Sequence, residues 1–111
     1  MTPRDLANGL LQLFQAYAYQ SLESALFLAV IHRGLLDAAG VRDTSQKVPP
    51  WIQREAAEFL LGRTGCLYAS LCNLEPSWYL KHVRTFLRLT TGVSSPRDLI
   101  TTQTQTQENL P

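Results

Sequence analysis

The chain of 111 residues contains ten basic and nine acidic residues, so its formal net charge is +1. This balance excludes a general electrostatic attraction to nucleic acid or to an acidic membrane, and any basic function must be local. Hydrophobic residues make up 45% of the chain and charged residues 17%, which is a globular composition with more apolar area than a monomer needs to bury. The length predicts a single domain, and the apolar surplus predicts a partner or self-association.

The first predicted helix begins at the N-terminus. Thr2 can accept backbone hydrogen bonds as an N-cap, Pro3 suits the first helical position, and Asp5 adds negative charge to the first turn. Apolar residues then recur at spacings of three and four and share one helical face: Leu6, Leu10, Leu13 and Tyr17. The segment is therefore expected to form a helix.

A second helix is predicted to start at Ser21, which would cap it, with Glu23 in the first turn. A break just before Ser21 is expected because one helix from the N-terminus to Ala39 would be far longer than the average helix. The run "ALFLAVI" at 25–31 is apolar on all sides, which predicts a central helix packed by neighbours, with a buried strand as the alternative. Gly40 is expected to end this element.

The third predicted helix follows a polar connection that closes on Pro49 and Pro50. Its apolar face is formed by Ile52, Ala56, Phe59 and Leu60. Gly62 and Gly65 indicate a turn at "GRTG", after which "CLYASLCN" is expected to form a short helix that ends near Asn73. A single helix kinked at the two glycines is the alternative.

The clearest amphipathic pattern lies between Pro76, a helix-start signal, and Gly92, a helix-stop signal. One helical face collects Tyr79, Val83, Phe86 and Leu87, and the opposite face collects Lys81, Arg84 and Arg88. We call these three cations the basic stripe; His82 stands beside them. The basic stripe is either the solvent face of the helix or a site for phosphates or an acidic partner.

Residues 93–111 alternate Thr and Gln with almost no hydrophobic mass, so we expect a tail that is disordered when free and a folded domain that spans residues 1–92. The tail repeats "TPRDL" of residues 2–6 as "SPRDL" at 95–99. Both copies have the residue order that starts a helix, but only the first precedes an apolar helical face. A tail that folds against a partner is the alternative.

The sequence contains no Gly-rich phosphate loop, no nucleophile elbow, no zinc-protease motif and no Cys-x-x-Cys pair. His32 and His82 lack a carboxylate three or four residues later. Glu55 and Glu58 lie one helical turn apart, but a di-metal site also needs matching Glu and His ligands from other helices. We therefore expect no enzyme activity, no metal and no cofactor.

Export and membrane insertion are not indicated either. The N-terminus lacks an apolar stretch that ends in small residues, and the longest apolar run is far shorter than the roughly 18 residues of a membrane span. Cys66 and Cys72 are too few for a disulfide framework, and we expect both to be reduced, buried and inert. The sequence predicts a soluble, cytoplasmic protein.

Large aromatic rings on the predicted helices are the candidate partner contacts. Trp51 and Trp78 each follow a Pro that begins a helix, where a ring either staples the helix start or lies exposed as an interface anchor. The full set of candidate anchors is Trp51, Phe59, Trp78, Tyr79 and Phe86. Some of these rings are expected to belong to the core instead.

Successive helical hairpins resemble the tetratricopeptide class, whose stacked hairpins leave a concave face for a partner helix. "ESALFLAV", "PPW" and "EFLLGRTGCLYASL" are similar to the small tetratricopeptide-like chaperones of type III secretion needle subunits. The matching residues in the last segment are Glu58, Leu61, Gly62, Leu67 and Leu71. The connection before the third helix is shorter than in that family, which carries an extra hairpin there. The resemblance implies a cytosolic complex in which a groove sequesters an aggregation-prone amphipathic helix.

The sequence thus predicts an all-α bundle of four or five helices with a non-catalytic function. We expect an adaptor or chaperone-like module that binds a helix of another protein in an apolar groove. Two alternatives stay open: a small nucleic-acid or anionic-surface binder that uses the basic stripe, and a structural homo-oligomer that buries the apolar surplus against itself.

Overall fold

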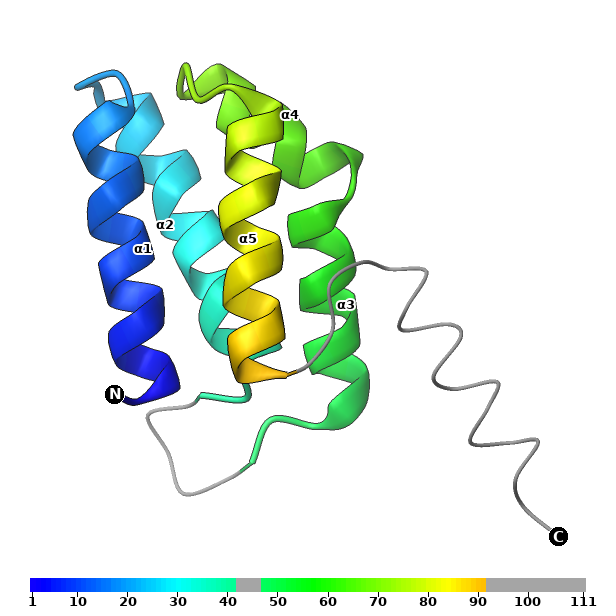
Figure 1. Ribbon diagram of the computed structural model, residues 1–111. Coiled ribbons are helices and arrows are strands. Elements are labelled where there is room, and N and C mark those ends of the chain that lie inside the picture. Colours follow the sequence, from blue (N-terminus) through cyan, green and yellow to red (C-terminus); the bar gives the residue numbers. More distant parts are fainter. Residues whose placement is uncertain (42–46, 92–111) are drawn as a thin grey trace, which may run out of the picture.

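The computed structural model describes residues 1–41 and 47–91 of the chain (Figure 1). Within these ranges the chain is all-α, with α1 (Pro3–Tyr17), α2 (Leu22–Ala38), α3 (Pro50–Leu61), α4 (Arg63–Leu71) and α5 (Pro76–Thr90). The predicted fold class and number of helices are confirmed, and the strand alternative for residues 25–31 is wrong. The tail expected at 93–111 lies outside the described residues.

The helices form four antiparallel columns, because α3 and α4 together make one broken column (Figure 1). α1 rises along one side of the bundle, α2 returns, α3 and α4 rise again, and α5 descends beside α1. α2 packs on α1, α3 and α4, whereas α5 packs on α3, on α4 and, more sparsely, on α1. The sparse contact between α1 and α5 positions the candidate site.

The predicted starts of the first two helices agree with the structure. The Asp5 N–H donates to Thr2 Oγ1 (3.1 Å) and the Thr2 N–H donates to Asp5 Oδ2 (3.1 Å), which is a capping box at the start of α1. At the start of α2, the Ser24 N–H donates to Ser21 Oγ (3.1 Å). The break expected between these helices is therefore confirmed.

α2 and α4 end with the same backbone motif. Gly40 (φ 76°) and Asn73 (φ 66°) adopt left-handed conformations just after these helices. In each case the next residue donates its N–H to a carbonyl five positions earlier, at 2.8 Å, which is the Schellman pattern. The predicted ends at Gly40 and near Asn73 are confirmed.

The junction between α3 and α4 is tighter than the four-residue turn predicted at "GRTG", because α4 begins directly after Gly62. A Cβ at Gly65 would lie 2.5 Å from the Phe59 carbonyl oxygen and 2.7 Å from the Leu60 carbonyl oxygen. Only glycine lets the first turn of α4 pack this closely over the end of α3.

Tyr79 on α5 completes this junction. Its side chain is fully buried, and its hydroxyl donates a hydrogen bond to the Leu60 carbonyl oxygen at 2.7 Å. This carbonyl belongs to the last turn of α3, where carbonyls lack a partner within their own helix. Burial raises the pKa of the Tyr79 phenol, which keeps it protonated as a donor.

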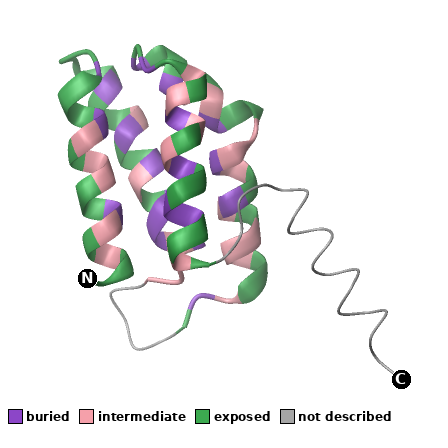
Figure 2. Cartoon of the chain, in the orientation of Figure 1, coloured by how far each residue is buried: buried purple, intermediate pink, exposed green. Residues whose placement is uncertain are grey.

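α2 is central but is not packed on all sides, so that prediction is wrong for one face. Figure 2 shows the buried residues collecting on the inner sides of the helices. Leu22, Leu26 and Val30 are 75%, 60% and 46% exposed. We call these three residues the α2 stripe. A bundle of four columns covers only the inward side of each column, so a uniformly apolar helix keeps one apolar face at the surface.

Both cysteines are free thiols. Cys72 is buried, and burial raises the pKa of its thiol, as expected for an inert cysteine. Cys66 is half-buried, which corrects the expectation that both are buried. In the ranges 1–41 and 47–91, no helix combines the length and apolar content that crossing a membrane requires.

We expect Tyr79→Phe to lower the free energy of unfolding by about 1 kcal/mol, because the Leu60 carbonyl loses its buried donor. Gly65→Ala should cost more, because its methyl group overlaps two carbonyl oxygens. Urea unfolding followed by circular dichroism measures both changes. Tyr68→Phe, on the half-buried side of α4, is the matched control and should change stability by less than about 0.5 kcal/mol. A Tyr79→Phe variant as stable as the wild type would contradict this account of the junction.

The Glu75 cap of α5 predicts a pH dependence. The Trp78 N–H donates to Glu75 Oε2 at 2.9 Å, and backbone hydrogen bonds from Trp78 and Ser77 lower the pKa of Glu75 below its ordinary value of 4.5. The charged cap therefore stabilises the fold above that value, and the contribution is lost as pH falls through the lowered pKa.

The unfolding temperature should therefore drop between about pH 5 and pH 3, and Glu75→Gln should show a smaller drop. The variant keeps part of the drop because of Asp5, whose pKa is also lowered by its hydrogen bonds with Thr2. Identical pH profiles for the wild type and Glu75→Gln would rule out this role of the cap.

Candidate partner-binding groove

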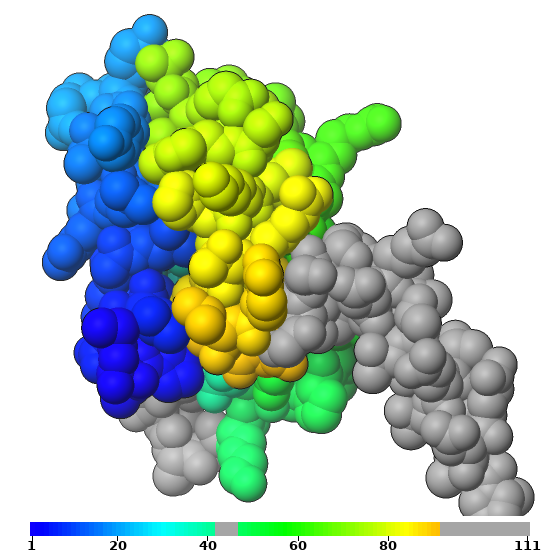
Figure 3. Space-filling model, in the orientation of Figure 1, coloured from blue at the N-terminus to red at the C-terminus, as the bar shows by residue number. Residues whose placement is uncertain are grey.

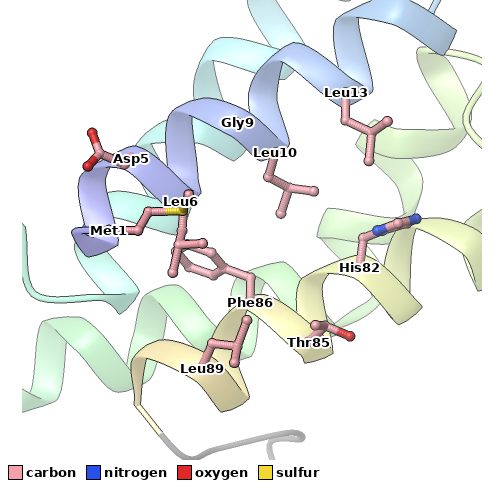
Figure 4. Close-up of a pocket in the computed structure, with 10 residues that line it drawn as sticks. All are labelled: Met1, Asp5, Leu6, Gly9, Leu10, Leu13, His82, Thr85, Phe86 and Leu89. Atoms are coloured by element: carbon pink, nitrogen blue, oxygen red, sulfur yellow. The ribbon is translucent and has the colours of Figure 1, made fainter.

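An apolar groove of about 310 Å³ lies between α1 and α5 (Figure 3, Figure 4). Its walls are formed by Met1, Asp5, Leu6, Gly9, Leu10 and Leu13 of the N-terminal segment and by His82, Thr85, Phe86 and Leu89 of α5. Figure 3 shows the two helices side by side on one face of the molecule. The groove exists because these helices pack sparsely on each other. We call it the α1/α5 groove.

Leucine side chains of α1 point into the α1/α5 groove. Figure 4 shows Leu10 and Leu13 directed toward α5, with Leu6 beside the ring of Phe86. The three leucines are half-buried, so a second molecule can still contact them. Gly9 adds room, since a Cβ at this position would meet nothing within 4 Å.

A cluster of aromatic rings lies next to the groove at His82. The Trp78 ring centroid lies 5.3 Å from that of Tyr17, 5.7 Å from that of Phe14 and 4.6 Å from that of His82. These contacts tie the C-terminal half of α1 to the first turns of α5. Because His82 both lines the groove and contacts Trp78, the ring cluster adjoins the groove.

The α5 rim of the groove is basic. Lys81 and Arg88 are exposed and lie four residues before and three residues after Thr85, which lines the groove. Residues at these spacings are neighbours on a helix surface. Arg84 is also exposed but lies about 100° further round the helix from Thr85. Two cations of the basic stripe therefore flank the groove, and the third points away from it.

Two of the candidate anchors, Tyr79 and Phe86, belong to the core, as expected for some members of the set. Tyr79 is fully buried, and its ring centroid lies 5.6 Å from that of Phe14. Phe86 is only 4% exposed and contributes an edge to the floor of the groove. Both rings are already packed against other core side chains, so neither can insert into a partner while the chain stays folded.

The other three predicted anchors do not form one site. Trp78 is half-buried beside the α1/α5 groove, whereas Trp51 is exposed in the first turn of α3. Phe59, half-buried on α3, contacts the Tyr68 ring at 5.7 Å between centroids. It also lines a second groove, of about 370 Å³, with Val30 of α2. The predicted set is thus divided between two regions of the bundle.

The residues weighed for metal binding or acid–base chemistry do not come together in one site. Glu55 and Glu58 are exposed on α3. His32 of α2 contacts α1, where its Nε2 is 2.8 Å from Asn8 Oδ1, and burial lowers its pKa. Across the part of the chain that the structure describes, no three His, Cys, Asp or Glu side chains are grouped as metal ligands would be.

Sequence reasoning missed the α1 wall of the groove. The sequence pattern places Leu6, Leu10 and Leu13 on one apolar face. In the structure these leucines are only half-buried, and the fully buried side chains of α1 are Ala7 and Phe14. The available signal was Gly9, because glycine inside a helix is unfavourable and indicates a local reason for its presence.

No protein-family model, no curated protein and no solved structure matches the chain. The resemblance to tetratricopeptide-like chaperones therefore stays a proposal, and function has to be inferred from the geometry of the site.

We expect Gly9→Ala to raise the free energy of unfolding by about 0.5–1 kcal/mol, because alanine favours the helix and its Cβ meets no neighbour. Gly34→Ala is the matched control in α2, where the added Cβ would lie 3.2 Å from Leu60 Cδ2. The free energy of unfolding of Gly34→Ala should not rise, because crowding against Leu60 offsets the helix preference of alanine. Urea unfolding measures both, and a less stable Gly9→Ala would show that the groove is closed in solution.

Proposed function

We propose that this chain is a non-catalytic protein-interaction module that binds an amphipathic helix of another protein in the α1/α5 groove. The observation that carries the proposal is the groove itself, an open apolar surface between two helices. A third helix laid along it would cover side chains that the chain leaves accessible on both walls. Such burial is the usual source of affinity when a helix binds in a groove.

The spacing of the α1 wall suits a helical partner. Leu6, Leu10 and Leu13 follow the helical repeat and extend about 10 Å along α1. This length corresponds to about two turns of a partner helix, whose own apolar residues at i, i+3 or i+4, and i+7 would pack against them. The partner is therefore expected to present a short apolar face rather than a long one.

The charge of the rim specifies the partner further. Lys81 and Arg88 flank the groove and are exposed, so acidic residues beside the apolar face of the partner would be attracted to them. Exposed charges of this kind speed association and reject basic partners more than they add affinity. Binding should therefore weaken only moderately as salt increases.

The module acts either as an adaptor or as a chaperone, depending on the state of its partner. A chaperone would cover a helix whose apolar face otherwise aggregates. The resemblance of "ESALFLAV", "PPW" and "EFLLGRTGCLYASL" to needle-subunit chaperones supports this version and favours a cytoplasmic location. An oligomerising helical subunit is then the expected cargo.

A second candidate function is binding of nucleic acid or another anionic surface by the basic stripe. It is favoured by the exposure of Lys81, Arg84 and Arg88 together on the outer face of α5. This binding would fall steeply with salt and would depend on Arg84 as strongly as on the other two cations. A helix in the groove would depend less on Arg84, which points away from the rim.

A substitution that fills the groove tests the proposal. Gly9→Trp places a large ring over the α1 wall without displacing the core, because the space around the added Cβ is open. Ser70→Trp adds the same ring to the exposed side of α4 as the matched control. Tagged wild type and both variants are incubated with extract of the native cell at near-physiological salt, and the retained proteins are identified by mass spectrometry.

We expect the wild type and Ser70→Trp to retain one helical protein at fixed stoichiometry, and Gly9→Trp to lose it. A peptide of the helix from that protein should bind Gly9→Trp at least about tenfold more weakly than the wild type. Lys81→Glu and Arg88→Glu should weaken peptide binding more than Arg84→Glu does. Equal peptide affinity for the wild type and Gly9→Trp would refute the groove, and retained nucleic acid with equal dependence on all three cations would favour the second candidate.

A further inference from the structure

The α2 stripe is an apolar row on a helix face that the bundle leaves uncovered. Leu22, Leu26 and Val30 recur every four residues, and all three are exposed large hydrophobic residues. Single exposed leucines need no explanation, but a row along one helix indicates a contact surface. This surface is distinct from the α1/α5 groove, because the buried side of α2 faces the bundle and the stripe faces away from it.

Opposite charges stand at the two ends of the same face. Glu23 is exposed in the first turn of α2. Arg33 lies near the other end, and its side chain is 55% exposed although its Nε is 3.3 Å from Asp37 Oδ1. One face of α2 therefore carries an acid, then apolar residues, then a base that is paired with Asp37 of the same helix.

We propose that two copies of the chain associate through α2 in an antiparallel arrangement. Glu23, Leu26, Val30 and Arg33 follow one another at steps of three, four and three residues, which is the spacing of the contact positions in a coiled coil. When Leu26 of one copy faces Val30 of the second copy, the same register places Glu23 opposite Arg33 of the second copy. The two-fold axis repeats both pairs.

A second copy suits this face because the face is complementary to itself. In this register Leu26 meets Val30 and Glu23 meets Arg33, so none of these four positions faces a like charge, and Leu22 lies beyond the paired positions. An antiparallel helix of another sequence would have to carry the same order of acid, apolar residues and base along its own chain. Self-association also accounts for part of the apolar surplus in the composition.

The size of the surface predicts a weak dimer. α2 has 17 residues and is about 26 Å long, so one helix pair buries less than the roughly 800 Å² per partner of a standard interface. The monomer–dimer equilibrium should therefore depend on protein concentration. Association through α2 leaves α1 and α5 free, so this inference can fail without affecting the proposed partner groove.

The first test measures mass against concentration by sedimentation equilibrium. We expect the wild type to shift from monomer toward dimer as concentration rises, and Leu26→Asp to stay monomeric. Leu67→Asp is the matched control, because Leu67 is 54% exposed on α4, and it should dimerise like the wild type. A wild type that is monomeric at every concentration, or a Leu67→Asp variant that dissociates like Leu26→Asp, would overturn the proposal.

A charge-reversal experiment tests the register. Glu23→Arg alone opposes two arginines in each pair, and Arg33→Glu alone opposes two glutamates, so each variant should dimerise at least about tenfold more weakly than the wild type. An equimolar mixture of the two variants restores opposite charges in both pairs. The mixed dimer should approach wild-type affinity to within about threefold, and circular dichroism checks that each variant is folded. Failure of the folded mixture to recover would overturn the antiparallel pairing.

Discussion

The hydrogen bond from the Tyr79 hydroxyl to the Leu60 carbonyl holds the broken column of α3 and α4 to α5, and the rest of the bundle is arranged around it. Gly65 makes this contact possible, because any side chain there would collide with the end of α3. Once Tyr79 is fixed, the rotation of α5 about its axis is fixed as well. Phe86 and Leu89 then face α1, Lys81 and Arg88 lie beside the groove, and Arg84 points away from it.

The α1/α5 groove results from unequal support along α1. α2 packs along this helix, but α5 reaches it chiefly through Trp78, which contacts Phe14 and Tyr17 near the C-terminal end. Toward the N-terminus, Gly9 offers no side chain to fill the space between the two helices. The leucines of this part of α1 consequently have a buried side and an accessible side, which is the property that a helix-binding surface needs.

The sequence predicts what depends on neighbouring residues and fails where distant elements decide. Thr2, Ser21, Gly40 and Asn73 act within one helical turn, so the helix boundaries that they determine were predictable. The exposed face of α2 could not be predicted, because a helix that is apolar all round has no polar side to mark the surface. The α1/α5 groove could not be predicted either, because its two walls are far apart in sequence and only their packing creates it. Trp78 and Tyr79 show the same limit. These adjacent aromatics differ by about 100° on the helix, so Trp78 stays half-buried whereas Tyr79 is fully buried in the core.

The net charge of +1 matters for a bundle with accessible leucines on more than one side. Molecules with so little net charge repel one another weakly, so electrostatics gives them little colloidal protection. Their solubility then depends on whether the apolar faces are covered. For this chain, the proposed association would therefore also help to keep the molecules dispersed at high concentration.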